Sequence, residues 1–375
     1  MIQYGKQSLS KRDYKAVKKV LDSGWLTIGP KVEEFESEIS RICGVEVFVV
    51  SSGTAALHSA YAAINITPGD EVITPPMTFI ATQSTAMHFG AKIRFCDIDS
   101  RTGNIDPNLA EKLINENTKA ITVVDYAGQP ADMDSFRRLC DKYDLYLIED
   151  AAHSLGSLYK NTPVGKLADI TTFSFFPTKN ITTCEGGAVA SPNQELLDIA
   201  KRFARQGLVR DPSKFKNVSD GRWHQEVHNI GLNYRLPDLL CALGISQIQR
   251  IEDFKNIRRE IFSFYSDHLK GIREIELPFN DNLTDPMWHL YPVRIKEGLR
   301  NRFYDYLWEC DIRVQVNYVP AYFHPVFQEL GYKKGLCPVS EKFYSEEISF
   351  PIHPDLTKKE LKKIVNVTKS FFQRN

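Results

Sequence analysis

The sequence predicts an α/β protein with a large, mostly parallel mixed sheet covered by helices and a smaller α+β domain at the C-terminal end. Short β-branched runs alternate with helical stretches between residues 47 and 148, which is the pattern of a mostly parallel sheet. After about residue 250 this alternation gives way to a long charged helix and isolated strands. A chain of 375 residues is long enough for one large core and a second, smaller one. We therefore expect a large domain over residues 1–250, with an N-terminal arm and helix, and a small domain over residues 251–375.

The elements of the large domain follow from the spacing of apolar residues. Tyr14, Val17 and Leu21 recur at helical intervals, which predicts an amphipathic helix over residues 11–22. Runs rich in Val and Ile predict strands at residues 47–50, 71–74, 92–96, 119–124 and 145–148. The stretches between them predict helices at residues 55–64, 79–89 and 132–143.

The small domain is predicted in the same way. A charged helix is expected over residues 251–269 and an amphipathic helix over residues 358–372. Strands are expected near residues 290–295 and 312–316.

Charge balance and cysteine spacing exclude several classes of protein. Lys plus Arg and Asp plus Glu both number 47, and the resulting zero net charge argues against binding to nucleic acid or to an anionic membrane. The seven cysteines are scattered without a Cys-x-x-Cys pair, which fits neither a disulfide framework nor a zinc site. The first residues lack the apolar segment of a signal peptide, and no apolar run is long enough to span a bilayer. We therefore expect a cytoplasmic protein without a metal.

One lysine stands in unusual surroundings. Lys179 follows the aromatic run Phe173-Ser174-Phe175-Phe176 and precedes the turn Glu185-Gly186-Gly187. Such surroundings would desolvate the ammonium group, lower its pKa and leave free amine able to attack a carbonyl. The alternative is a solvated loop lysine.

Three further features fall at the ends of predicted strands, where parallel sheets collect their active sites. Gly53 and Thr54 begin a helix and could hold a phosphate, although Ser52 could equally be an ordinary helix cap. Asp150 ends a buried strand, so its carboxylate needs a cation such as a protonated pyridine nitrogen, or else it caps the next loop. Phe79 could stack on a flat ring or could be a core residue.

These motifs, in this order, resemble one family. Ser52-Gly53-Thr54, Glu149-Asp150-Ala151-Ala152-His153, Phe173-Ser174-Phe175 followed by Lys179, and Glu185-Gly186-Gly187-Ala188 are similar to the sugar aminotransferases of the DegT/DnrJ/EryC1/StrS group. The resemblance runs nearly end to end and includes residues 25–30, 231–238 and 351–353. It implies a fold-type I enzyme that depends on pyridoxal 5′-phosphate (PLP) and uses L-glutamate as amino donor.

Three segments resemble one branch of this family. Residues 104–106, 124–128 and 315–318 are similar to the pseudaminic acid (flagellin-sugar) branch, whose members aminate C4 of a UDP-linked 4-keto-6-deoxy-N-acetylhexosamine. Residues 179–182 also resemble the enzymes that make UDP-4-amino-4-deoxy-L-arabinose. Other nucleotide keto-sugars, UDP-4-keto-arabinose or a dTDP-3- or 4-keto-6-deoxyhexose, therefore stay open as substrates.

The resemblance implies roles for individual residues. Lys179 would bind the coenzyme covalently, Asp150 would face its ring nitrogen, and His153 would lie on its O3′ side. The expected phosphate and ring contacts are Gly53, Thr54, Ser174 and Phe79. Asn233 would reach the phosphate of the neighbouring subunit, which implies a homodimer with shared active sites. The segments expected to line the nucleotide-sugar pocket contribute Tyr4, Trp25, Leu26, Thr27, Asn317 and Tyr318.

Three positions and one rival function stay open, and a second rival is disfavoured. Asn317 stands where the branch usually has His, and Cys184 replaces a smaller residue. Arg235 could bind a carboxylate or a phosphate, or form a structural ion pair. A PLP-dependent sugar dehydratase of this family would have His at position 179, so Lys179 argues against that function. A catalytically silent PLP-binding regulator is the rival from another class.

Overall fold

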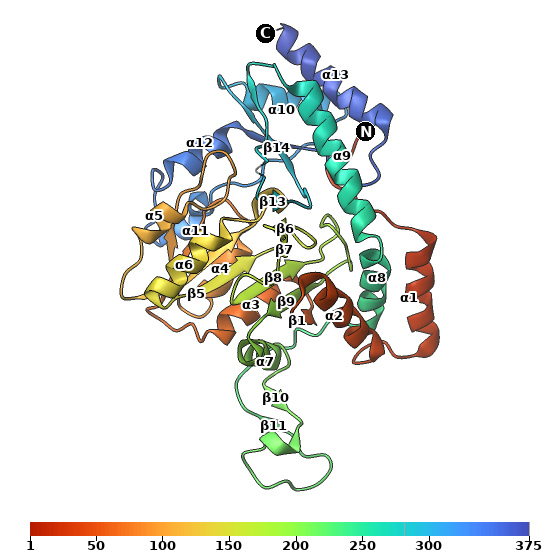
Figure 1. Cartoon of the computed structure of the whole chain (residues 1–375), viewed down its shortest axis with the longest axis vertical. Helices are drawn as coiled ribbons and strands as arrows, with labels where there is room; N and C mark the ends of the chain where they lie inside the picture. The colour runs from red at the N-terminus through yellow and green to blue at the C-terminus, as the bar shows by residue number, and fades with distance from the viewer. Residues whose placement is uncertain (281, 375) are drawn as a thin grey trace.

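The computed structural model describes residues 1–280 and 282–374. Within these residues the main sheet has seven strands in the order β1-β9-β8-β5-β4-β2-β3 (Figure 1). Its strands are β1 (Glu46–Val50), β2 (Glu71–Thr74), β3 (Lys92–Phe95), β4 (Thr118–Val124), β5 (Tyr146–Asp150), β8 (Ile170–Ser174) and β9 (Gly187–Ser191). Strands β3, β2, β4, β5 and β8 are parallel, whereas β9 runs antiparallel to both of its neighbours. The predicted mostly parallel mixed sheet is confirmed.

Helices cover both faces of this sheet because side chains alternate along each strand. Phe48 and Val50 of β1 pack with α3 (Gly53–Ala63), α4 (Ala81–Met87) and α7 (Gln194–Phe203). Val47 and Val49 pack on the other face with α2 (Pro30–Cys43) and α8 (Asp238–Ile248). Further along this second face, Leu147 packs with α6 (Met133–Tyr143). The strand ends are thereby held rigidly between two layers of helices.

The reversal of β9 places the loop that contains Lys179. Residues 175–186 leave the carboxyl end of β8 and return into β9 on the adjacent position of the sheet. The loop is closed by backbone hydrogen bonds from Phe175 N to Gly186 O (2.8 Å) and from Thr183 N to Phe175 O (3.0 Å). Lys179 therefore lies over the same sheet edge as the end of β5.

The C-terminal part has its own core. The helices α9 (Ile251–Leu269), α10 (Arg300–Glu309) and α13 (Lys358–Arg374) pack around a sheet of β12 (Ile275–Glu276), β14 (Tyr291–Ile295) and β15 (Glu347–Phe350). Ile2 joins this core from the N-terminus, whereas Tyr322 and Phe327 pack with the core of the main sheet. The boundary expected at residue 250 stays a prediction.

Two local predictions were wrong. The strand expected at residues 312–316 is not formed, since Ile312 and Gln315 make isolated bridges to Ile2 and Ser349. Residues 312–316 have the β-branched pattern of a strand, but each bridge to a neighbouring segment involves a single residue pair. Phe79 does not begin a helix, because α4 starts at Ala81 and Phe79 lies in the preceding turn.

The N-terminal helix and several short elements complete the chain. The predicted first helix is confirmed as α1 (Lys11–Ser23), whose N-terminus is capped reciprocally by Ser10 and Asp13. The remaining elements are α5 (Pro107–Glu111), η1 (Tyr126–Gly128), β6 (Leu158–Tyr159), β7 (Thr162–Pro163), η2 (Pro212–Lys214), β13 (Thr284–Asp285), η3 (Ala321–Phe323), α11 (Pro325–Glu329) and α12 (Pro338–Glu346). Among the described residues, no helix combines the length and apolar character needed to cross a membrane.

A narrow arm projects from the body of the molecule. Strands β10 (Leu208–Val209) and β11 (Glu226–Val227) pair antiparallel, and the chain between them extends away from the main sheet (Figure 1). We refer to residues 208–230 as the arm. Its large exposed apolar residues include Val218, Trp223 and Ile230, which are 90%, 79% and 90% exposed.

Candidate active site

A cavity of about 290 Å³ lies at the carboxyl ends of β5 and β8 and at the N-terminus of α3. It brings together most of the residues that the sequence singled out. The predicted residues that line it are Tyr4, Gly53, Thr54, Phe79, Asp150, Ser174, Lys179, Asn317 and Tyr318. They come from six separate parts of the chain, so only the folded protein assembles them.

Lys179 is half-buried and lines the cavity. Its backbone N–H donates to Phe176 O at 2.9 Å, and the next side chain, Asn180, donates to His153 O at 2.6 Å. Burial lowers the pKa of the Lys179 amine to about 8, against an opposing effect of the Asp150 carboxylate. The solvated-lysine reading is therefore wrong, since near neutral pH part of this amine is the nucleophilic free base.

Asp150 is held in place at the end of β5. Its Oδ2 accepts a hydrogen bond from Thr82 Oγ1 at 2.7 Å, and Oδ1 accepts from Ala152 N at 3.2 Å. Burial raises the pKa of Asp150, while Thr82, Lys179 and Ala152 act to lower it. A buried carboxylate whose ionised form is this poorly solvated would gain most from a cation placed against it in the cavity.

The N-terminus of α3 forms an anion cradle. Ser52 is the helix cap, since its Oγ accepts from Ala55 N at 3.0 Å. Ser52 is thus an ordinary helix cap, as the alternative interpretation predicted. The backbone N–H groups of Gly53 and Thr54 make no hydrogen bond among the described residues and can bind an anion. A Cβ at Gly53 would lie 2.8 Å from Ser174 Cβ and 3.0 Å from Ser174 Oγ, so glycine is required for this close approach.

Two histidines, His153 and His289, lie in contact beside the cavity with their ring planes tilted by 33°. His153 lies behind its wall, where Nε2 is 3.1 Å from Tyr318 Oη, and its ring centroid is 4.2 Å from that of His289. Burial lowers the pKa of both imidazoles well below its usual range, so both are neutral. Among the described residues, His153 Nδ1 and His289 Nδ1 are both buried without a hydrogen-bond partner, and of these two residues only His289 lines the cavity.

Phe79 faces the cavity with 60% of its surface exposed, so the alternative of a core phenylalanine is wrong. Four predicted residues lie elsewhere. Trp25 and Leu26 are 62% and 49% exposed, and Thr27 and Asn233 are also exposed. None of these four lines the cavity of its own chain.

The sequence reasoning missed Thr82, which orients Asp150, and His289, which lines the cavity. Thr82 lies in the first turn of α4, with its hydroxyl 3.0 Å from that of Thr78, and no motif in the sequence points to it. His289 follows a loop without regular periodicity, and no local pattern points to it.

Together these groups fit a flat, phosphorylated cofactor with a basic ring nitrogen and a carbonyl. The cradle at Gly53 suits the phosphate, and Asp150 suits the ring nitrogen. Phe79 offers an exposed aromatic face, and Lys179 offers an amine of lowered pKa. PLP has each of these chemical features.

Comparisons with known proteins agree with this geometry. The DegT/DnrJ/EryC1/StrS aminotransferase family matches residues 7–369. A UDP-4-amino-4,6-dideoxy-N-acetyl-beta-L-altrosamine transaminase from Campylobacter jejuni is 36% identical, covering 100% of this chain and 98% of that protein. The structure of Helicobacter pylori PseC, an aminotransferase involved in the biosynthesis of pseudoaminic acid, has a TM-score of 0.93 at 33% identity and covers both chains fully. The PLP-form of Streptococcus pneumoniae Spr1654 has a TM-score of 0.93 at 27% identity, covering 100% of this chain and 99% of that one.

Proposed function

Because the chain belongs to the DegT/DnrJ/EryC1/StrS family and is therefore a PLP-dependent sugar aminotransferase, we propose that it moves the amino group of L-glutamate onto the C4 keto group of a UDP-linked 4-keto-6-deoxy-N-acetylhexosamine. The observation that carries the catalytic part is the shared cavity of Lys179 and Asp150, next to the anion cradle of α3. The sugar is suggested by the motifs at residues 104–106, 124–128 and 315–318 and by the names of the Campylobacter and Helicobacter relatives.

The residues that would hold the coenzyme are already oriented. Gly53, Thr54 and Ser174 would bind the phosphate, and Phe79 would cover the ring. Bound PLP supplies an electron sink for the carbon that exchanges its amino group. Asp150, fixed by Thr82, would keep the ring nitrogen protonated, which is the electrostatic part of that function.

Lys179 has the acid–base role in this proposal. Once released from the coenzyme, its amine would take a proton from the carbon of glutamate and later deliver a proton to the carbon of the sugar. A pKa near 8 suits both directions, because a general base works best when its pKa is close to the operating pH.

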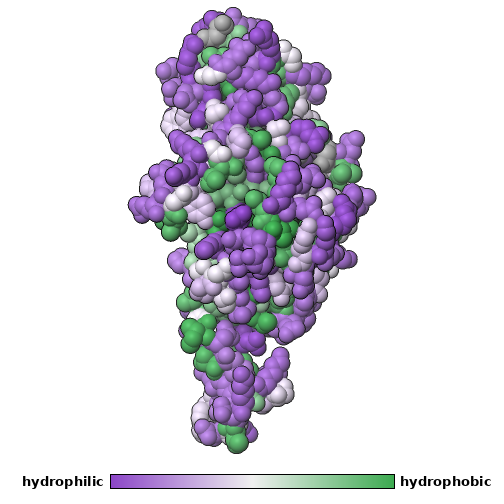
Figure 2. Space-filling view, turned by 90° about the vertical axis from the view of Figure 1, so that its left-hand side faces the viewer, coloured by the Kyte–Doolittle hydropathy of each residue, from purple (hydrophilic) through white to green (hydrophobic). Residues whose placement is uncertain are grey.

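The second subunit completes the proposal. Trp25, Leu26, Thr27 and Asn233 are exposed on the single chain, and we infer that they meet the cavity of a partner in a homodimer. Apolar residues are also exposed on the projecting arm (Figure 2), where a second copy of the chain would cover them. We place this reaction in the cytoplasm, in agreement with the free thiols of all seven cysteines.

The first half-reaction tests the assignment. Purified protein loaded with PLP should form 2-oxoglutarate from L-glutamate in a single turnover, with a change in the absorbance of the bound coenzyme. Lys179→Ala should lose more than about a thousandfold in this rate. Lys166→Ala, an exposed lysine in a nearby loop, is the matched control and should be unaffected.

A Lys179→Ala protein that turns over like wild type would contradict the catalytic role. Wild-type protein that binds PLP but forms no 2-oxoglutarate would favour the silent regulator instead. The sugar is tested by mass spectrometry of products from UDP- and dTDP-linked keto-sugars. A preference for UDP-4-keto-arabinose or a dTDP-sugar would replace the proposed substrate while leaving the aminotransferase assignment intact.

A further inference from the structure

A chain of hydrogen bonds behind the cavity fixes the side-chain amide of Asn317. Its Nδ2 donates to Tyr4 Oη at 2.6 Å and to Ser349 Oγ at 3.0 Å. Both amide hydrogens are therefore used inside the protein. Asn317 lines the cavity, and among the described residues its Oδ1 accepts no hydrogen bond and is not shielded from solvent. The amide thus offers the cavity an acceptor and no donor.

Glu347 determines the orientation of the Asn317 side-chain amide through two hydrogen bonds. Its Oε2 accepts from Asn317 N at 2.6 Å, and its Oε1 accepts from the Ser349 hydroxyl at 2.5 Å. Above the Glu347 pKa of about 8 the carboxylate is ionised and can only accept, so the single hydrogen of Ser349 is then used on Glu347. The Ser349 oxygen can then only accept, so the Asn317 side chain must turn its NH₂ group toward it.

The main chain around Asn317 is also held. Tyr126 Oη donates to Asn317 O at 2.6 Å. Glu347 and Ser349 are two residues apart on β15, which puts both side chains on one face of that strand. Both are fully buried, so the arrangement does not depend on solvent.

We propose that Asn317 Oδ1 is a specificity-determining acceptor for a hydrogen-bond donor, a hydroxyl or an amide N–H, on the sugar that receives the amino group. Glu347 is a positioning residue that acts on the sugar through Ser349 and Asn317. This inference rests on the proposed function, because it needs a sugar in this cavity. A sugar without the donor leaves Asn317 Oδ1 desolvated and unpaired, and kcat/KM falls by about a hundredfold.

The protonation state of Glu347 decides whether the orientation of the Asn317 amide is required or only permitted. Burial raises the pKa of Glu347 to about 8. When the carboxyl is protonated, the proton sits on Oε1, since Oε2 faces the Asn317 N–H, and it then donates to Ser349. The Ser349 hydrogen is released, and the observed amide direction is permitted but no longer required. Gln at position 347 reproduces this second state, because its NH₂ group would donate to Ser349.

The test compares sugars on the holoenzyme. The accepted UDP-4-keto-sugar is measured beside analogues that each lack one donor through deoxygenation, O-methylation or N-methylation. In wild type, one analogue should lose about a hundredfold in kcat/KM. At about pH 9, where the Glu347 carboxyl of wild type is mostly ionised, Glu347→Gln should lower this discrimination between the two sugars by about tenfold, through KM, while the glutamate half-reaction keeps its wild-type rate.

Glu341→Gln is the matched control. Glu341 also accepts from a hydroxyl, Tyr322 Oη at 2.8 Å, and from a backbone N–H, Gly335 N at 2.5 Å, but it does not line the cavity. Glu341→Gln should leave the ratio of kcat/KM between the accepted sugar and the analogue unchanged. Were Glu347→Gln not to fold, Ser349→Ala breaks the same chain and should lower the ratio as well.

Two results would overturn the inference: no analogue is discriminated by wild type, or the ratio in Glu347→Gln and Ser349→Ala equals that of wild type. Failure of the proposed function would look different. In that case wild-type protein would show no glutamate half-reaction, whatever the sugar.

Discussion

Two carboxylates, Asp150 in the cavity and Glu226 in the arm, have nearly the same surface exposure and opposite electrostatics. Asp150 is 6% exposed and Glu226 is 8% exposed. The pKa of Asp150 is raised, chiefly by burial, whereas that of Glu226 is lowered to about 2. The exposed fraction of a carboxylate therefore does not decide whether its pKa is raised or lowered.

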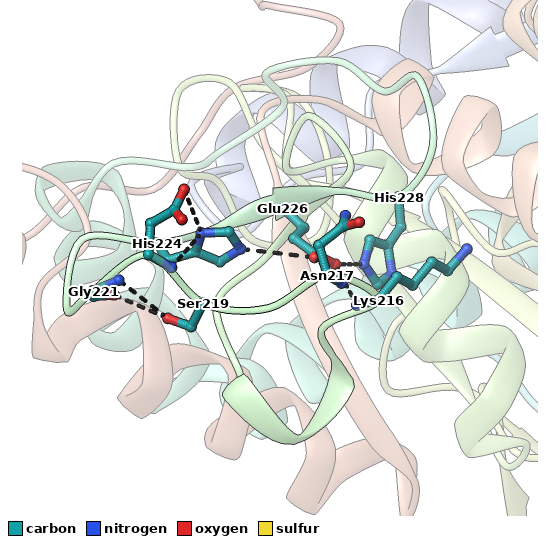
Figure 3. Close-up of polar contacts among 8 residues, drawn as sticks. Lys216, Asn217, Ser219, Gly221, His224, Glu226 and His228 are labelled. Carbon is teal, nitrogen blue, oxygen red and sulfur yellow. Dashed lines mark hydrogen bonds and ion pairs between the residues drawn. The ribbon is translucent and has the colours of Figure 1, made fainter.

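The difference lies in what surrounds each group. Glu226 accepts hydrogen bonds from Lys216 N and Asn217 N at 2.7 Å each, and from His228 Nε2 at 2.6 Å (Figure 3). Because the arm is thin, little protein lies around this carboxylate, and the hydrogen bonds outweigh desolvation. Asp150 has fewer donors and lies among the layers of the main sheet, so desolvation wins. A carboxylate that is to interact with a ligand through its charge needs surroundings like those of Asp150, with few donors of its own.

Removing the charge of Asp150 should affect the protein more than any change in the arm. Asp150→Asn keeps the shape and can still accept from Thr82, but it cannot stabilise a protonated ring nitrogen. We expect kcat/KM for glutamate to fall by about 10²–10³. Single-turnover kinetics measure this. Asp106→Asn is the control, since Asp106 caps α5 and Asn caps helices equally well. A loss below tenfold at Asp150 would remove the contrast with Glu226.

The pH dependence of coenzyme capture sharpens the same contrast. The free amine of Lys179 is the reactive form, so the rate at which the apoenzyme captures PLP should rise with pH and level off above the pKa of about 8. Between pH 6 and pH 8 the free-amine fraction rises by about fiftyfold for this pKa. An ordinary lysine, with a pKa of roughly 10.4, would show a rate still rising at pH 9.5. Stopped-flow absorbance at several pH values distinguishes the two profiles.

Loosening the arm should have a smaller effect. In Glu226→Gln one carboxylate oxygen becomes a donor, so the backbone N–H groups of Lys216 and Asn217 lose part of their acceptor. We expect amide exchange at these two positions to accelerate by about tenfold. If the arm packs on a partner subunit, the dimer should also dissociate more readily in sedimentation experiments. Asp220→Asn, whose carboxylate lies 4.0 Å from His224, is the control within the same arm. Unchanged exchange would show that Glu226 does not fasten the arm.

The cavity could be predicted from the sequence to the extent that it depends on strand ends. Gly53 follows and Asp150 ends a predicted strand, and parallel topology alone brings such ends together. Lys179 stands out by its aromatic surroundings, since no strand is predicted directly before it. Glu347 and Ser349 could not be recognised, because Glu-Ile-Ser-Phe has the alternation of an ordinary half-buried strand, yet both faces are buried. Trp25 and Asn233 could not be placed either. Neither lines the cavity of its own chain, and the contact with a partner's cavity that we propose is not encoded by the spacing of apolar residues within one chain.

The smallest expected effect concerns Cys184, whose presence beside the active-site loop the sequence left unexplained. Cys184 is exposed and adopts φ 69°, the left-handed region that favours glycine. A residue with a Cβ costs about 1–2 kcal/mol there. Glycine removes this strain but gains about 0.5–1 kcal/mol of conformational freedom in the unfolded chain. Cys184→Gly should therefore raise the free energy of unfolding by about 0.5–1 kcal/mol, measured by urea denaturation.

The matched control is Cys184→Ala, which removes the thiol but keeps the Cβ, so its stability should stay at the wild-type value. An equal gain in both variants would mean that the thiol, and not the backbone conformation, is unfavourable. Because the Thr182 hydroxyl accepts from Cys184 N at 2.9 Å, the loop is held in this conformation from within, and neither variant should alter the position of Lys179. Substitutions of Cys184 should therefore change the free energy of unfolding without changing the reaction rate at Lys179, although both residues belong to the loop between β8 and β9.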